Sequence, residues 1–223
     1  MCGRFTLKTS REIVANLLDL AEILELPPRY NIAPTQSIAA VRLDAAAARE
    51  LVLLRWGLIP SWADDPSIGS RLLNARAETA ATKPSFRAAF RARRCLILAD
   101  GFYEWQKIPG GKQPFYIRMQ DDAPFAFAGL WEHWQHEDKT IESCTILTTA
   151  ANKLMRPLHD RMPVILPRDT YRHWLDPGCD DREMLMQMMR PYPAEDMLAY
   201  CVSTLVNKYQ NDNAKCVAPY SEI

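Results

Sequence analysis

Residues 94–119 read RCLILADGFYEWQKIPGGKQPFYIRM. This stretch holds three runs of apolar and aromatic residues, and the turn-like sequence PGGK separates the last two of them. Such runs around a glycine-rich turn are typical of antiparallel strands. The same pattern continues in FAFAGLWEHW (125–134) and ESCTILTTA (142–150). The middle of the chain therefore predicts a series of antiparallel strands.

The flanking sequence adds further strands and several short helices. Strands are predicted at SIAAVRL (37–43), ELVLLRW (50–56) and AYCVSTL (199–205), and helices at FRAAFRARR (86–94), RDTYRHWL (168–175) and DDREMLMQMMR (180–190). No internal repeat or linker interrupts the chain. We therefore expect an α+β fold with a curled, barrel-like, mainly antiparallel sheet and peripheral helices, in one domain over residues 1–223.

A first helix is predicted near the N-terminus. Thr9 and Glu12 have the spacing of a capping box, and an apolar stripe follows at Ile13, Leu17, Leu20, Ala21 and Leu24. Pro27 and Pro28 end this helix. The next segment, RYNIAPTQ (29–36), is predicted to be a loop that presents Arg29, Asn31 and Pro34.

Composition excludes several classes of protein. Lysine plus arginine equals aspartate plus glutamate at 27 each, so any nucleic-acid role needs a local basic patch. No apolar run approaches the roughly 20 residues of a membrane span, and no signal peptide is visible. The six cysteines form no C-x-x-C pair, so neither a metal site nor a cofactor is expected, and His133 and His136 lack a third ligand. We expect a cytoplasmic protein without membrane contact.

An arginine row and the N-terminal cysteine each have two interpretations. Arg87, Arg91 and Arg94 lie on one side of the predicted helix 86–94, either as a solvated face or as a DNA-facing one. Cys2 is an ordinary thiol if Met1 stays. If Met1 is removed, Cys2 becomes a 1,2-aminothiol that can trap an aldehyde as a thiazolidine or act as a nucleophile with its own base.

Other polar residues stand where a purely structural role is unexpected. Asn74 and Arg76 alternate on one side of an extended segment, and Glu104 sits between two aromatic residues, a setting in which a carboxyl group can exchange a proton near neutrality. His159 and Arg161 precede an apolar strand. Each also has a purely structural interpretation. Asn74 can hydrogen-bond to backbone groups in a turn, Glu104 can pair with Lys107 on a strand surface, and His159 can cap backbone groups or fill a gap in the packing. Together with Cys2 they form an acid and base set around a nucleophile.

The chain resembles the SRAP family of abasic-site processing proteins. The resemblance rests on MCGR, RYNIAPTQ, RWGLIPSWA, NARAET, DGFYEW and HDRMPVIL, in the family's order over most of the chain. It implies a monomeric sensor of abasic sites in single-stranded DNA, associated with the nucleoid when bound. In that family the initiator methionine is removed, and the cysteine at the position of Cys2 forms a thiazolidine with the ring-opened deoxyribose.

The resemblance also implies roles for individual residues. Cys2 is the nucleophile, Glu104 accepts a proton from the amine or orients it, His159 is the acid and base at the sugar, and Asn74 holds the sugar or the cysteine. Phosphate clamps are expected at Arg4, Arg76 and Arg161, with a weaker contact at Arg29; Asn31 and Pro34 belong to the same DNA-binding set. Trp62 is expected to stack on a base, whereas Trp56 is expected in the core. Some relatives carry two adjacent tryptophans here, but Trp62 is followed by Ala63.

Three alternatives remain at this stage. The first is an N-terminal-nucleophile hydrolase of the glutamine amidotransferase type, although Arg4 replaces the apolar residue of that family. The second is a peptidase, an activity once proposed for the SRAP family, which the same residues would serve in removing Met1. The third is a single-stranded DNA-binding module in which Cys2 has no chemical role.

Overall fold

The computed structural model describes residues 2–20 and 25–220. Its strands are β1 (Phe5–Leu7), β2 (Arg29–Ile32), β3 (Ser37–Leu43), β4 (Arg49–Trp56), β5 (Asn74–Arg76), β6 (Arg94–Ala99), β7 (Gly101–Ile108), β8 (Gly111–Met119), β9 (Phe125–His136), β10 (Lys139–Ala150), β11 (Arg161–Pro163), β12 (Ile165–Leu166) and β13 (Met197–Cys201). The α-helices are α1 (Arg11–Leu18), α2 (Ala77–Ala80), α3 (Arg87–Ala92), α4 (Tyr171–Leu175) and α5 (Arg182–Met188).

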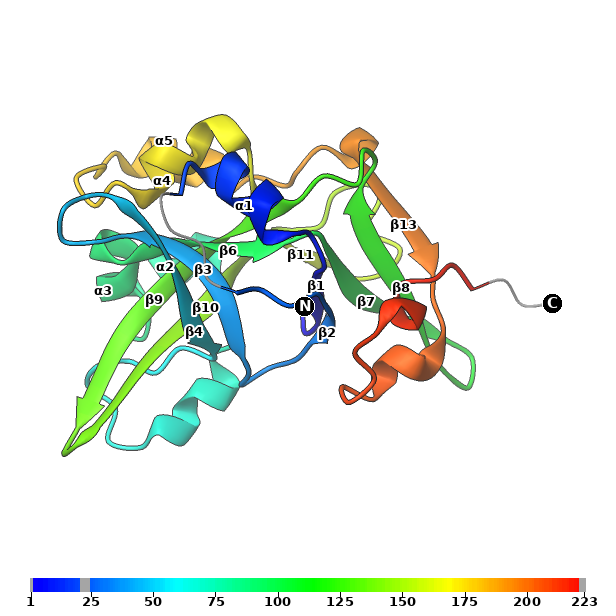
Figure 1. Ribbon diagram of the computed structural model, residues 1–223, viewed down its shortest axis with the longest axis horizontal. Helices are drawn as coiled ribbons and strands as arrows, with labels where there is room; N and C mark the ends of the chain where they lie inside the picture. The colour runs from blue at the N-terminus through cyan, green and yellow to red at the C-terminus, as the bar shows by residue number, and fades with distance from the viewer. Residues whose placement is uncertain (1, 21–24, 221–223) are drawn as a thin grey trace.

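Five of the strands close into a barrel. Hydrogen-bonded pairs run from β10 to β4, β3, β6 and β9, and β9 pairs with β10 to complete the ring. The β4–β10 pair is parallel and the other four are antiparallel. Apolar residues of these strands fill the interior, and the helices lie at the periphery (Figure 1). The predicted α+β class with a curled, mainly antiparallel sheet is confirmed.

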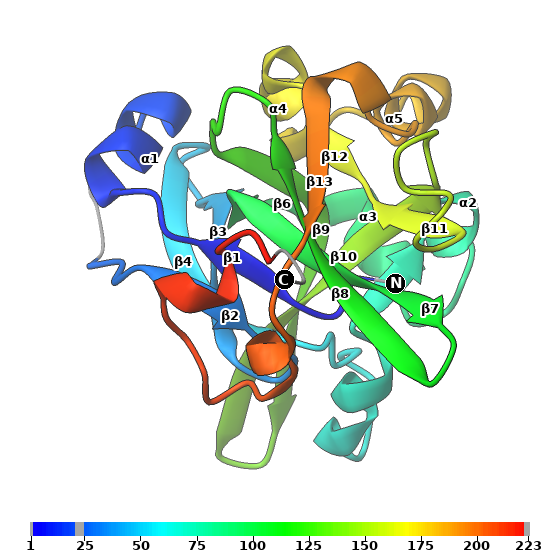
Figure 2. The same ribbon diagram turned by 90° about the vertical axis from the view of Figure 1, so that its right-hand side faces the viewer.

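A second sheet carries the N-terminal segment. Its order is β13-β8-β7-β1-β2, and Figure 2 shows β7, β8 and β13 crossing in front of the barrel. Strand β1 lies between β7 and β2, and Phe5 packs its ring against Trp56 and Phe127 of the barrel at centroid distances of 5.2 and 5.8 Å. This packing fixes the residues immediately before β1, which include Cys2.

The prediction for the first helix is wrong in its cap and its buried face. Helix α1 follows Ser10, which makes no side-chain capping bond, and the Thr9 hydroxyl instead donates to the buried carboxylate of Asp100 at 2.9 Å. The buried side chains of α1 are Val14, Ala15 and Leu18, whereas Ile13 is 53% exposed. The expected apolar positions Ala21 and Leu24 lie outside the described residues.

Two other predictions are corrected by pairing across the chain. Residues 29–32 are not a loop but strand β2, because they pair with β1. Arg94 lies neither on a solvated face nor on a DNA-facing one, because it begins β6 at 3% exposure and donates to the carbonyl oxygens of Phe90 and Trp174 at 2.8 and 2.7 Å. Arg87 and Arg91 on α3 are exposed.

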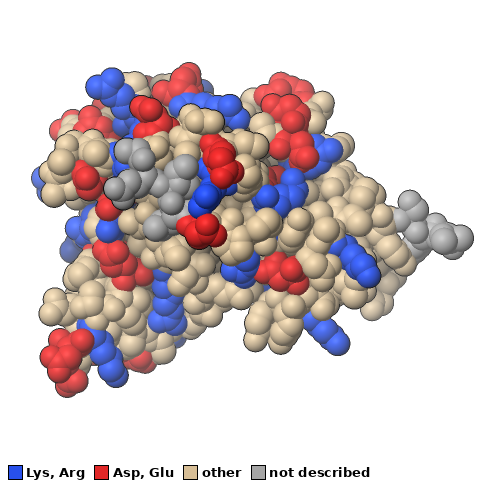
Figure 3. All heavy atoms as spheres, in the orientation of Figure 1, with Lys and Arg blue, Asp and Glu red and all other residues tan. Residues whose placement is uncertain are grey.

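The distribution of charge on the surface reflects the equal numbers of acidic and basic residues. Positive and negative side chains alternate over the face shown in Figure 3, without a broad field of one sign. Among the described residues, no helix has the length and apolar character needed to cross a membrane.

Candidate active site and nucleic-acid interface

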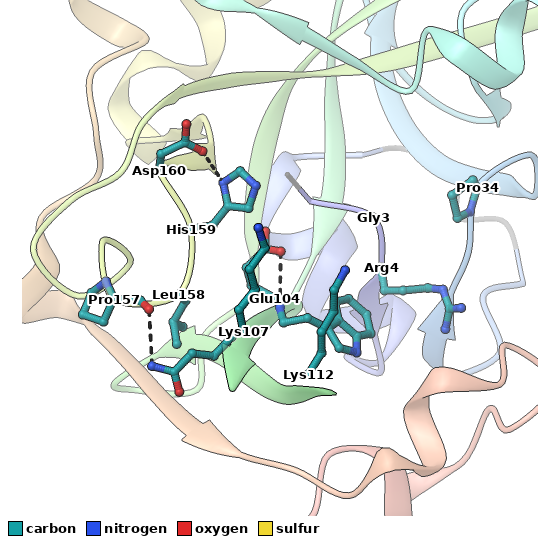
Figure 4. A pocket seen from close by; sticks show the side chains of 12 residues that line it. Gly3, Arg4, Pro34, Glu104, Lys107, Lys112, Pro157, Leu158, His159 and Asp160 are labelled. Atoms are coloured by element: carbon teal, nitrogen blue, oxygen red, sulfur yellow. Dashed lines mark hydrogen bonds and ion pairs between the residues drawn. The ribbon is translucent and has the colours of Figure 1, made fainter. Parts of the chain in front are cut away.

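A cleft of about 900 Å³ opens beside the N-terminal segment. It is bounded by residues 3–4, by the β7–β8 hairpin and by residues 157–160 (Figure 4). The residues that line it are Gly3, Arg4, Pro34, Glu104, Trp105, Gln106, Lys107, Lys112, Pro157, Leu158, His159 and Asp160. Four of the predicted site residues, Arg4, Pro34, Glu104 and His159, therefore meet at one cavity.

Cys2 lies buried next to this cleft and is held on both sides. The Asn74 amide nitrogen donates to the Cys2 carbonyl oxygen at 3.0 Å, and Asn74 is itself placed by the parallel pairing of β5 with β10. The Cys2 thiol lies 3.8 Å from the Arg4 carbonyl oxygen, which also accepts the Tyr103 amide. Asn74 therefore positions the cysteine backbone, as one of its predicted roles requires.

The environment of the Cys2 thiol favours its protonated form. Complete burial raises the pKa of this thiol, and the nearby Glu104 carboxylate raises it further. A thiol of ordinary pKa would be partly ionised near neutrality. Both effects shift the Cys2 thiol away from this behaviour and favour its protonated form.

Glu104 comes from the inner half of β7. Its side chain is buried, with the residue at 5% exposure, and its Oε1 atom accepts the Trp105 amide at 3.3 Å. A surface pair with Lys107 does not describe this position, because the carboxylate is in the interior while Lys107 is exposed. Glu104 therefore lies buried at the cleft, close to Cys2.

His159 has two different partners at one ring nitrogen. Its Nδ1 atom accepts the Arg161 backbone amide at 3.0 Å and lies 2.7 Å from Asp160 Oδ1. The first contact requires an unprotonated Nδ1, which places the proton of a neutral ring on Nε2. The second becomes an ion pair when the ring is protonated on both nitrogens. Nδ1 of His159 therefore has a partner in each of the two protonation states of the ring.

Arg4 is anchored to the C-terminal strap, the name we use for residues 203–217. Its Nη1 atom donates to Asn31 Oδ1 at 2.8 Å and to the Val206 carbonyl at 2.7 Å, and its Nη2 atom donates to the Asn207 carbonyl at 3.2 Å. These contacts use three of the five N–H donors of a guanidinium group. Arg4 thus lines the cleft in an orientation set by the strap.

Asn31 and Arg29 form the inner attachment of the strap. Asn31 is fully buried, and its amide nitrogen donates to the carbonyl oxygens of Val206, Lys208 and Asn211 at 3.1, 3.1 and 2.8 Å. Arg29 pairs with Asp212 at 2.5 Å. Both side chains hold the strap in place in this structure.

Arg76 and Arg161 lie on the two strands that flank the end of β10. Arg161 donates to both carboxylate oxygens of Glu78 at 2.6 and 2.9 Å and also bonds to the Thr148 carbonyl. Arg76 is exposed, and no ion pair is formed by it within the described residues. Of these two arginines, Arg76 is the one presented to solvent.

Trp62 projects from a separate loop and is 58% exposed. The loop folds tightly because Gly57, at φ 126°, faces Gly69 so closely that a Cβ atom on either glycine would meet the other's carbonyl oxygen at 2.6 Å. The indole N–H of Trp134 donates to the Ala63 carbonyl at 2.6 Å. Ala63 is buried, so the position after Trp62 packs inward, while Trp56 is in the core as predicted.

Sequence reasoning assigned no site role to three residues. Asp212 accepts backbone amides from Tyr30 and Asn31, and no local signal indicates a partner so distant in sequence. The pair Lys107 and Lys112 could have been found from the sequence. The two lysines flank the PGG turn at positions that a two-residue hairpin places opposite each other. Within residues 2–20 and 25–220, no group of three potential metal ligands is present.

Comparison with known proteins gives one family. The model of the family described as SOS response associated peptidase (SRAP) matches residues 1–209. The chain belongs to the SRAP family. It is 44% identical over 220 residues to the abasic site processing protein YoaM of Bacillus subtilis (strain 168), covering 96% of each chain.

More distant SRAP relatives extend the same result. The abasic site processing protein YedK of Escherichia coli (strain K12) is 31% identical, over 98% of this chain and 100% of the relative. HMCES of Xenopus tropicalis, also named an abasic site processing protein, is 34% identical over 86% of this chain and 66% of the relative. A crystal structure of a protein from Bacteroides thetaiotaomicron superposes with a TM-score of 0.89 at 26% identity, over 99% and 100% of the two chains.

Proposed function

We propose that this SRAP protein processes abasic sites in single-stranded DNA by forming a covalent link through Cys2. The observation that carries the proposal is the convergence of four distant segments. Residues 2–4, Asn74, Glu104 and His159 meet at or immediately behind one cleft. Relatives named abasic site processing proteins support the substrate, and the exposed Arg76 and Trp62 supply a cation and a stacking surface for a single strand.

The proposed reaction starts with removal of Met1, which lies outside the described residues. The freed α-amine of Cys2 attacks the aldehyde carbon of the ring-opened deoxyribose, and loss of one water gives an imine. The thiol sulfur then adds to the imine carbon while its proton passes to the nitrogen, which closes a thiazolidine. One aldehyde and one aminothiol thus give one ring and one water.

The burial of Cys2 supports one order for these steps. Because the thiol is kept neutral, the amine is the first nucleophile and the sulfur follows once the imine has formed. Glu104 accepts a proton from the amine. His159 acts as general acid and base, exchanging a proton with the sugar hydroxyl as the ring opens. Both side chains line the cleft that the sugar would enter.

Two of the expected phosphate clamps, Arg4 and Arg161, already have internal partners and therefore have a supporting role in this proposal. Arg4 offers its two remaining donors to a phosphate while the strap holds it, and Arg161 contacts DNA only if it shares or leaves Glu78. All the proposed residues come from one chain, so a monomer suffices for a reaction on DNA in the cytoplasm. A peptidase activity limited to Met1 would use the same cleft.

Intact-protein mass spectrometry tests the proposal. We expect the purified protein to lack Met1 and to gain the mass of one abasic-site oligonucleotide minus one water, in a form that survives denaturation. The Cys2→Ser variant should bind the same oligonucleotide but form no stable adduct. Retention of Met1, or a processed protein without an adduct, would favour the N-terminal-nucleophile hydrolase or the simple DNA-binding module instead.

A further inference from the structure

The β7–β8 hairpin places two lysines directly opposite each other. Pro109 and Gly110 form its turn, and the strand register pairs Ile108 with Gly111 and Lys107 with Lys112. The next pair inward, Gln106 and Gln113, carries no charge. The free hairpin end therefore presents two positive charges within a few residues of its turn.

This pairing is unfavourable in the isolated protein. Side chains directly opposite in an antiparallel pair have Cβ atoms about 4.5–5.5 Å apart, and like charges there repel. Both lysines are exposed, and in the part of the chain that the structure describes neither forms an ion pair. An anion bound between them would remove the repulsion.

Both lysines also line the cleft beside Cys2. Figure 4 shows them among the side chains that surround this cavity, which they share with Arg4. A lysine ammonium is a compact charge on a flexible stem of four carbons, so two of them can converge on neighbouring phosphate oxygens. The hairpin end thus has the charge, reach and position of a phosphate site.

We propose that Lys107 and Lys112 bind the phosphates of the nucleotides next to the lesion, on the hairpin side of the cleft. The proposal rests on the proposed function, because it requires single-stranded DNA to enter this cavity. It adds a contact that is separate from the one expected at Arg76. It also explains why the hairpin keeps a repulsive pair at the cleft.

Protection of the sheet edge is the competing explanation for these lysines. Strand β1 pairs with β7 only at Gly101 and Phe102, so the outer half of β7 is an open edge of the kind that lysine protects against aggregation. That role does not require both lysines to line one cleft. The two explanations also differ in what is lost when the charges are removed.

The test measures DNA binding and thermal unfolding of Lys107→Gln, Lys112→Gln and the double variant. The probe is a single-stranded oligonucleotide with a tetrahydrofuran abasic analogue, which has no aldehyde and so forms no cross-link. Lys139→Gln is the matched control, because Lys139 begins β10 beside the turn of the other long hairpin and does not line the cleft. Fluorescence anisotropy is recorded between 50 and 200 mM salt.

We expect each single variant to lower the log–log salt slope by about 0.7 and the double variant by about 1.4, with affinity at 50 mM salt reduced about fivefold per lysine. The thermal midpoint should stay constant or rise as the repulsion is relieved, and Lys139→Gln should match the wild type. A double variant that aggregates but binds with unchanged affinity and slope would overturn the subsite and leave the proposed function intact. A wild-type protein that does not bind the probe would overturn both.

Discussion

The charged side chains of two regions differ in whether they have partners within the protein. Behind Arg4, the strap side is a network in which Arg4, Asn31 and Asp212 have internal partners. On the hairpin and at the end of β5, Lys107, Lys112 and Arg76 are exposed, and within the described residues none of them forms an ion pair. The difference separates cations that build the site from cations that remain available to a ligand, although both kinds look alike in the sequence.

The largest effect is expected at the centre of the strap network. Asn31→Ala removes a buried amide that donates to the carbonyl groups of Val206, Lys208 and Asn211 and accepts from Arg4. Because each lost hydrogen bond contributes about 0.5–1.5 kcal/mol and the contributions are not additive, we expect the free energy of unfolding to fall by about 3 kcal/mol. Urea denaturation measures this change.

A matched substitution separates the lost hydrogen bonds from lost volume. Asn31→Asp keeps the size of the side chain but replaces the amide donor with an acceptor that faces the same three carbonyls. We expect it to be at least as destabilising as Asn31→Ala. If either variant unfolds within about 0.5 kcal/mol of the wild type, the range of a neutral surface substitution, the strap does not depend on Asn31.

A smaller effect is expected from pH at the buried thiol of Cys2. Burial raises the pKa of this thiol in the folded state above the unfolded value of about 8.5, so its stabilising contribution is complete below pH 8.5 and is lost as the pH rises further. At pH 9.5 the loss relative to pH 7 is about 1.4 kcal/mol for one such thiol. Urea denaturation at both pH values should show that Cys2→Ala loses less stability than the wild type by this amount.

The pH prediction has a simple internal check. Cys95 and Cys144 are also buried thiols with raised pKa values, and they are present in both proteins, so their contributions cancel in the difference. An identical pH response of the wild type and Cys2→Ala would show that the Cys2 thiol is accessible to solvent.

The smallest effect is expected at the exposed Arg76. Arg76→Gln should leave the free energy of unfolding within about 0.5 kcal/mol of the wild type, because the side chain is exposed. Its affinity for single-stranded DNA should fall by about 1 kcal/mol and its salt slope by about 0.7. Anisotropy titrations with the tetrahydrofuran oligonucleotide measure both quantities. A loss of stability without a loss of affinity would move Arg76 to the structural group.

Sequence predicted the fold where the signal is local. Strand β3 matches the predicted 37–43, and the PGGK turn led to the β7–β8 hairpin, because apolar runs and turn residues act within a few positions. The face of α1 was misplaced because nearly every residue around Val14 is apolar, and tertiary packing chose between the alternatives. The burial of Arg94 was not predictable because several of its partners, such as the Trp174 carbonyl, lie about 80 residues away.

The site was predictable as a set of residue types but not as an arrangement. Cys2, Asn74, Glu104 and His159 were chosen because their chemistry is out of place in a purely structural role, and the structure brings them together. The sequence could not show that Arg4 and Arg29 have internal partners while Arg76 is exposed, because the difference depends on Asp212 and on carbonyl groups of the strap. Backbone acceptors are present at every residue, so they leave no mark in the sequence.

The strap also determines when the site can exist during synthesis. Arg4 is held by the carbonyl groups of Val206 and Asn207, some 200 residues later in the chain. A growing chain therefore carries Arg4 from the start of synthesis but lacks its partners until the strap has left the ribosome. Arg4, among the earliest residues to be translated, is thus among the last to receive its partners, and a chain cut short before the strap lacks the carbonyl groups that orient it.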